Sequence, residues 1–442
     1  RSTRGWSEAP AMTDHRSSSR VGLLVGMAAA LILWARAPFA ARNLWGEDGA
    51  RFLAHAMEGG LFEPLFRSLA GYFHFLPRLV GWLAALGPLE MAPQVVFAAC
   101  ASAVAWFATT IFLSADRHLD RQWSRIALAL TPVLLPILGF ESIANVTNLH
   151  FLMLCAASVV LVGRQERSGR KVNGVVLVAM AGLTSPLTAG LAPLVVLRVW
   201  WDRRESGSLS PAPVVAGWAL GLAVQLAMMA TLVDEGREMT SDRSITRAGF
   251  LFLERVVSYN LVPFWPRVSS TDGVGGIDAD LVVRTLAALV VLGSVAAAVI
   301  GTARHQRSWG LTERAELVLT VPIAGLAFFA AASMLTGPEP RYAVFPAFSL
   351  VWAILVVMES LGDSARAPRS GRLVSVTIAL VLAASVVTHW VPSPIRRTGP
   401  TWAAGLESAA RECETNPDGR VEIPILPEGW TVPVDCSDVL EG

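Results

Sequence analysis

The chain has 442 residues, of which 53% are hydrophobic and only 16% charged, and its mean hydropathy of +0.50 excludes an ordinary soluble domain. The net charge is +1 and the basic residues are scattered between apolar runs, which argues against a nucleic-acid partner. Apolar runs of roughly 17 to 25 residues recur along the chain, so we expect an all-α polytopic membrane protein embedded in a lipid bilayer.

The first segment in chain order, residues 1–19, is basic and is expected to be a cytoplasmic tail. Residues 1–11 precede the first methionine, Met12, and are interpreted as an upstream extension or a cloning remnant outside the fold. The following run, VGLLVGMAAALILWARAPFAA, is long for a signal-peptide core and has no clear cleavage pattern. It therefore predicts a retained first helix.

About eleven membrane-spanning helices are predicted within a transmembrane domain of residues 20–390. Short arginine-rich loops, which stay cytoplasmic in membrane proteins, recur at residues 116–125, 163–171, 200–207, 302–307 and 364–372. If all of them face the cytoplasm, the C-terminus of this multi-pass plasma-membrane protein lies outside. The predicted spans are residues 20–38, 92–114, 125–140, 148–163, 173–186, 187–201, 211–232, 280–301, 316–335, 342–361 and 373–390.

The outer face then receives a first loop of residues 39–91 and an extracytoplasmic tail of residues 391–442. The short apolar run 77–86 is placed in the outer interface, because counting it as a span would move a basic loop to the outer side. Cys413 and Cys436 both lie in the tail. An oxidising outer compartment makes a disulfide between them plausible.

The stretch WGEDGARFLAHAMEGG, residues 45–60, follows the first span and begins with two carboxylates, Glu47 and Asp48. Helical spacing places its polar residues on one face and its apolar residues on the other, which predicts an amphipathic interfacial helix. On a structural interpretation, the two acids simply begin this helix, where the helix dipole favours negative charge.

A functional interpretation arises from two further outer segments. One carries Glu141, Asn145, Asn148 and His150, and the other carries Glu339, Arg341 and Tyr342. Polar groups at membrane depth are costly unless they are partnered or functional, so we expect these segments to converge on a cavity with the first loop. The asparagines and His150 also have a structural interpretation as helix caps.

A carboxylate in such a cavity can act as a general base, and an arginine can neutralise a phosphate leaving group. The substrate that needs both groups is a lipid-linked sugar phosphate. Its phosphate is expected at Arg341 or Arg78, with the sugar facing Asp48.

The segments WGEDG, GYFHFLPRL, NVTNLH, TSPL and PRY resemble the GT-C superfamily of polyprenyl-phosphate-dependent membrane glycosyltransferases, near a branch of uncharacterised actinobacterial integral membrane proteins. In that superfamily the acid of the first outer loop is the catalytic base. The resemblance therefore implies Asp48 as the base, with Glu47 as its alternative or partner. It also implies that Arg341 meets the lipid phosphate, with Tyr342 beside it.

The predicted function is transfer of a sugar from a polyprenyl-phosphate donor to an extracytoplasmic glycan or lipid of the cell envelope, by a general-base inverting mechanism. No metal or other cofactor is expected, since no second set of acids completes a metal site. The alternative is a transporter or flippase of lipid-linked saccharides, in which the same groups bind cargo without reacting. A third interpretation, an envelope scaffold, requires no role for Asp48.

Overall fold

The computed structural model describes residues 15–139, 143–163, 168–207, 212–231, 248–249, 251–261, 293, 312–336, 339–362, 369–390 and 394–441. In these ranges, six helices are long and apolar enough to cross a membrane: Ser18–Arg36, Leu89–Arg117, Gln122–Gly139, Pro213–Thr231, Glu313–Ser333 and Pro340–Ser360. The chain is therefore a helical, polytopic membrane protein, as its sequence predicts.

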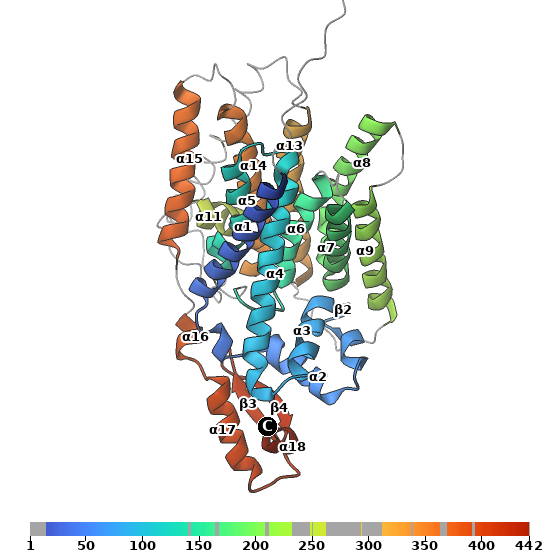
Figure 1. Ribbon diagram of the computed structural model, residues 1–442, viewed down its shortest axis with the longest axis vertical. Helices are drawn as coiled ribbons and strands as arrows, with labels where there is room; N and C mark the ends of the chain where they lie inside the picture. Colours follow the sequence, from blue (N-terminus) through green and yellow to red (C-terminus); the bar gives the residue numbers. More distant parts are fainter. Residues whose placement is uncertain are drawn as a thin grey trace, which may run out of the picture.

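The helices of the bundle lie roughly side by side (Figure 1). Each overlaps a predicted span, and the predicted span 280–301 lies outside the described residues except for residue 293. Several are shorter than a full span, so the predicted number of about eleven is not confirmed. The bundle contains α1 (His15–Arg36), α4 (Ala92–Ser114), α5 (Gln122–Leu134), α6 (Leu149–Val162), α7 (Ser168–Thr184), α8 (Ala192–Ser206), α9 (Pro213–Thr231), α13 (Thr312–Thr336), α14 (Val344–Gly362) and α15 (Arg369–Thr388).

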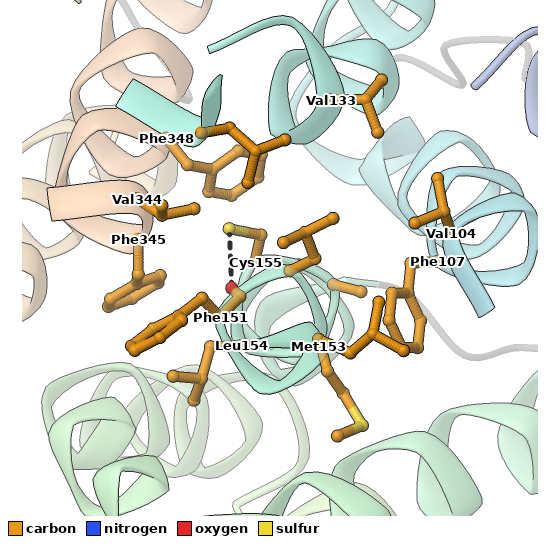
Figure 2. Packing of buried hydrophobic residues seen from close by; sticks show 14 of the residues in the cluster. Val104, Phe107, Val133, Phe151, Met153, Leu154, Cys155, Val344, Phe345 and Phe348 are labelled. Carbon is orange, nitrogen blue, oxygen red and sulfur yellow. Dashed lines mark hydrogen bonds between the residues drawn. The ribbon is translucent and has the colours of Figure 1, made fainter. Parts of the chain in front are cut away.

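Helix α6 is central, and every one of its residues is buried. A helix that is apolar on all sides can be covered by neighbours all round, which explains its lack of amphipathic character. Figure 2 shows side chains of α4, α5 and α14 packed around it, namely Val104, Phe107, Val133, Val344, Phe345 and Phe348.

Small residues allow α7 and α9 to approach closely. A Cβ added at Gly221 would lie 2.4 Å from the carbonyl oxygen of Ala179, and one added at Gly182 would lie 2.7 Å from the Gly221 backbone. Such contacts are typical of helices that associate within membranes, where close backbone packing provides the attraction.

Prolines set two helix ends that differ from the predictions. The predicted span 125–140 ends early as α5, at Leu134, because Pro136 disfavours helical geometry in the residue before it. Arg36 caps this end by donating to the carbonyls of Val133 at 2.7 Å and Leu135 at 3.0 Å. The predicted span 187–201 begins late, since Pro186–Leu191 forms a 3₁₀ turn before α8.

Ion pairs join helix ends at one end of the bundle, which we call the basic end. Arg117, whose side chain is 2% exposed, pairs with Glu205 at 2.6 Å and Glu313 at 3.1 Å. Arg170 pairs with Asp116 at 2.8 Å. Three of the predicted basic loops therefore meet at the same end of the bundle, as the positive-inside rule requires.

The first loop lies at the opposite end, which we call the cap end (Figure 1). It contains a π-helical turn (Asp48–Leu53) that continues into α2 (Ala54–Glu58), a short hairpin of β1 (Ser68–Leu69) and β2 (Tyr72–Phe73), and α3 (Phe75–Ala85). The predicted interfacial run 77–86 corresponds to α3. The sequence predicted Asp48 on the polar face of this helix, and the structure shows that its side chain is buried against residues 146 and 147.

The C-terminal residues fold into a small cap against the first loop (Figure 1). It contains α16 (Pro394–Thr398), α17 (Trp402–Cys413), the antiparallel pair β3 (Arg420–Ile425) and β4 (Trp430–Asp435), and α18 (Cys436–Glu441). A disulfide joins Cys413 and Cys436, the pair expected from the sequence. The cap docks where Leu426 donates to the carbonyl of Leu44 at 3.1 Å and Trp402 Nε1 donates to that of Leu89 at 2.8 Å.

Candidate functional site

Asp48 is enclosed at the cap end, with a residue exposure of 2%. Its Oδ2 accepts a hydrogen bond from the Val146 N–H at 2.9 Å. Its Oδ1 accepts from the Thr147 N–H at 2.9 Å and from the Thr147 hydroxyl at 2.6 Å. Burial raises the pKa of Asp48 from 3.8 to about 6, although these hydrogen bonds favour its charged form. The carboxylate thus fastens the first loop to the loop that precedes α6.

Glu47 has different surroundings. It is partly exposed, and its carboxylate makes no hydrogen bond or ion pair within the part of the chain that the structure describes. Its charge acts on the neighbouring Asp48. Of the two acids left open by the sequence, only Glu47 combines an unengaged carboxylate with access to solvent or substrate.

Residues 143–148 form the second part of the site, and Asn145 and Asn148 are both buried there. The Asn145 side chain accepts a hydrogen bond from the Asn148 N–H at 2.9 Å, which satisfies a donor at the start of α6. Glu141, predicted to belong to the same group, lies outside the described residues.

His150 and Phe151, at the start of α6, connect this segment to the segment of Arg341 and Tyr342. The His150 Nδ1 donates to the carbonyl of Thr147 at 2.7 Å. The Tyr342 ring packs edge-on against Phe151 with centroids 5.6 Å apart, and Arg341 is close enough for its charge to act on His150. The Arg341 side chain is 20% exposed and pairs with Glu339.

Arg78 is engaged inside the first loop and is 1% exposed. Its guanidinium contacts His55 Nδ1 at 3.2 Å, donates to the carbonyl of Ser68 at 3.0 Å and lies 5.4 Å from the centre of the Phe52 ring. These contacts hold α2, the hairpin and α3 together. The structure therefore places Arg78 in the framework of the first loop.

Sequence patterns missed two members of the site, Thr147 and Arg396. Thr147 belongs to NVT, which resembles a glycosylation sequon, and this pattern gave no indication of its hydrogen bonds to Asp48. Arg396 is 3% exposed and donates to the carbonyl of Ala144 at 2.9 Å. It follows the last span, and no local periodicity relates it to the first loop.

The three outer segments that the sequence singled out thus lie together at the cap end. Their contacts run from Asp48 through Thr147 to His150. The next residue, Phe151, packs against Tyr342, which follows Arg341. Within the described ranges, no three or more His, Cys, Asp or Glu side chains gather as a metal site. The arrangement places the partly exposed side chains of Glu47 and Arg341 at one end of a membrane-spanning bundle.

No protein-family model matches the chain, and no curated protein matches it. Among solved structures it is similar to ArnT from Cupriavidus metallidurans bound to undecaprenyl phosphate, with 15% identity and a TM-score of 0.46 over 90% of this chain and 80% of that chain. It is also similar to the Archaeoglobus fulgidus oligosaccharyltransferase in complex with zinc and sulfate, with 13% identity and a TM-score of 0.39 over 89% of this chain and 56% of that chain.

Proposed function

We propose that this protein is a membrane glycosyltransferase that moves a sugar from a polyprenyl-phosphate donor to a glycan or lipid acceptor of the cell envelope. The observation that carries the proposal is the meeting of three segments at one end of the bundle. Asp48 of the first loop binds Thr147, just before His150. Phe151 packs against Tyr342, next to Arg341. The cap, with its disulfide, is at the same end, and we assign that end to the outer, oxidising side of the membrane.

Glu47 is the general base of the proposed reaction. It accepts the proton of the acceptor hydroxyl as the oxygen attacks the anomeric carbon, and the bond from that carbon to the phosphate oxygen breaks, with inversion. Asp48 is less suited to this role, because three donors already occupy its carboxylate and its side chain is enclosed. The role of Asp48 is to hold Glu47 and the loop before α6 in place.

Arg341 is the group proposed to meet the donor phosphate. Its guanidinium is partly exposed, and phosphate can replace Glu339 as its anionic partner. An arginine so placed stabilises the negative charge that develops on the leaving polyprenyl phosphate. The Arg78 guanidinium already contacts His55 and the Ser68 carbonyl within the first loop, so we assign it no contact with the sugar-donor substrate.

The experiment that tests this proposal uses the full-length protein in liposomes with a panel of radiolabelled polyprenyl-phosphate sugars and cell-envelope acceptors. The proposal predicts a covalent product that carries the label, formed only in the presence of the protein. Movement of intact donor between the two leaflets, with no labelled product from any donor, would overturn the proposal in favour of a transporter of lipid-linked saccharides.

A further inference from the structure

Charged side chains bind both the N–H groups and the carbonyl groups of the loop of residues 143–147. Asp48 accepts hydrogen bonds from its last two N–H groups, as described above. The Arg396 guanidinium donates to its first two carbonyls, those of Ile143 at 3.3 Å and Ala144 at 2.9 Å. A buried anion and a buried cation therefore compensate each other across the peptide groups of one short loop.

The backbone of this loop is strained. Ala144 has a φ of 51°, in the left-handed region that is unfavourable for a residue with a Cβ. Such a conformation persists where surrounding contacts hold it. The hydrogen bonds from Arg396 to Ile143 and Ala144 fall directly at this residue.

Arg396 also contacts the segment that leads into Glu47. Its Nη1 donates to Asn43 Oδ1 at 3.4 Å, and Asn43 Nδ2 donates back to the Arg396 carbonyl at 2.9 Å. The guanidinium lies 4.9 Å from the centre of the Trp45 ring. Arg396 thus contacts the 143–147 loop and the residues just before Glu47 at the same time.

The cap also binds the segment that leads into Glu47. The backbone N–H of Gly46 donates to the carbonyl of Leu426, whose own N–H donates to the carbonyl of Leu44. The chain is therefore fixed on one side of Glu47 by the cap and Arg396, and on the other side by Asp48. Between these two anchors, the Glu47 carboxylate has no hydrogen bond or ion pair with any residue that the structure describes.

We propose that Arg396 is a positioning residue for sugar transfer, which joins the 143–147 loop to the Asn43–Trp45 segment and thereby sets the place of the Glu47 carboxylate. The inference rests on the proposed function. On this inference, the docked C-terminal segment that carries Arg396 belongs to the site, although that segment supplies no reacting group.

The first arm of the test measures transfer by full-length protein in liposomes. Arg396→Gln is expected to lower kcat by at least about tenfold while the KM for the donor stays within about threefold, because misplacement of a base affects the chemical step more than binding. Arg396→Lys, which keeps the charge, is expected to recover part of the loss. Arg397→Gln is the matched control, since Arg397 is exposed, and it should leave both quantities unchanged.

The second arm needs no activity. Hydrogen exchange of the Val146 and Thr147 amides is expected to be at least about tenfold faster in Arg396→Gln and unchanged in Arg397→Gln. Should Arg396→Gln not fold, Asn43→Ser removes the hydrogen bonds of the Asn43 side chain to the Arg396 guanidinium and carbonyl, and it should shift kcat and exchange in the same directions by a smaller factor.

Unchanged exchange, or a kcat of Arg396→Gln equal to that of the wild type, would overturn the inference while the proposed function stands. A wild type that transfers no sugar at all would overturn the proposed function and the role of Arg396 in catalysis. The exchange rates would then still report whether Arg396 holds the loop.

Discussion

Asp48 Oδ1 accepts hydrogen bonds from both the backbone N–H and the hydroxyl of Thr147, at 2.9 and 2.6 Å. One carboxylate oxygen therefore binds both donors of a residue that lies just before the central helix α6. Hydrogen bonds to a charged group contribute more than neutral ones, and both residues are buried. This contact fixes the first outer loop relative to the core of the bundle.

Thr147→Val is expected to lower the free energy of unfolding by about 1.5–3 kcal/mol, because it removes the shortest donor to Asp48 without changing the shape of the side chain much. Thermal unfolding in detergent, followed by circular dichroism, measures the change. Thr231→Val is the matched control, since Thr231 is exposed and bonds only within its own helix. Equal effects of the two substitutions would mean that the Asp48 contact contributes little.

The pKa of Asp48 makes the stability of the protein depend on pH. Because burial raises this pKa from 3.8 to about 6, the folded protein binds more protons than the unfolded chain between about pH 4 and pH 6. The contribution of Asp48 to the free energy of unfolding is therefore greatest below about pH 4, and it falls by up to about 3 kcal/mol as the pH rises to 6. Asp48→Asn should lack this slope. The idea fails if the difference in stability between wild type and Asp48→Asn is the same throughout this range.

Gly49→Ala is expected to weaken docking of the cap. A Cβ at Gly49 would lie 2.8 Å from Ile425 Cδ1 and 2.9 Å from Val432 Cγ2, both in the cap hairpin. Overpacking of this kind costs about 1–3 kcal/mol. Faster proteolysis of the cap in the variant is the expected observation. Gly60→Ala, where the added Cβ meets no atom within 4 Å, should be cleaved at the wild-type rate.

The disulfide between Cys413 and Cys436 closes a loop with a sequence separation of 23 residues. Its loss should destabilise the cap by about 3 kcal/mol in the chain-entropy model. A double Cys413→Ser, Cys436→Ser variant should therefore release the cap at a lower temperature. A reductant should bring the wild type to the same temperature and leave the variant unchanged; no shift in either protein would contradict this prediction.

The helices of this fold were largely predictable, because long apolar runs separated by arginine-rich loops report directly on contact with lipid. The bounds predicted for one span, 92–114, are those of α4. The strands of the cap hairpin were missed because Pro424 and Pro433 lie within them, and proline disfavours a strand assignment even where apolar residues alternate.

The site was predictable only in part. Sequence reasoning singled out the first-loop acids and the two segments that now lie beside them. It could not separate Glu47 from Asp48, because the burial of Asp48 depends on its contacts with Val146 and Thr147, which are distant in the sequence. Nor could it find Arg396, whose partner Asn43 is 353 positions away, since local patterns carry no information on such contacts.

The central claim, that Glu47 is the base of a sugar transfer, is tested most directly by comparing Glu47→Gln with the wild type for single-turnover transfer and for donor binding. The account predicts a fall in the transfer rate of about 10²–10⁴-fold with donor binding nearly unchanged. Glu90→Gln, an exposed acid of the same loop, should transfer at the wild-type rate. Transfer by Glu47→Gln at the wild-type rate would contradict the claim.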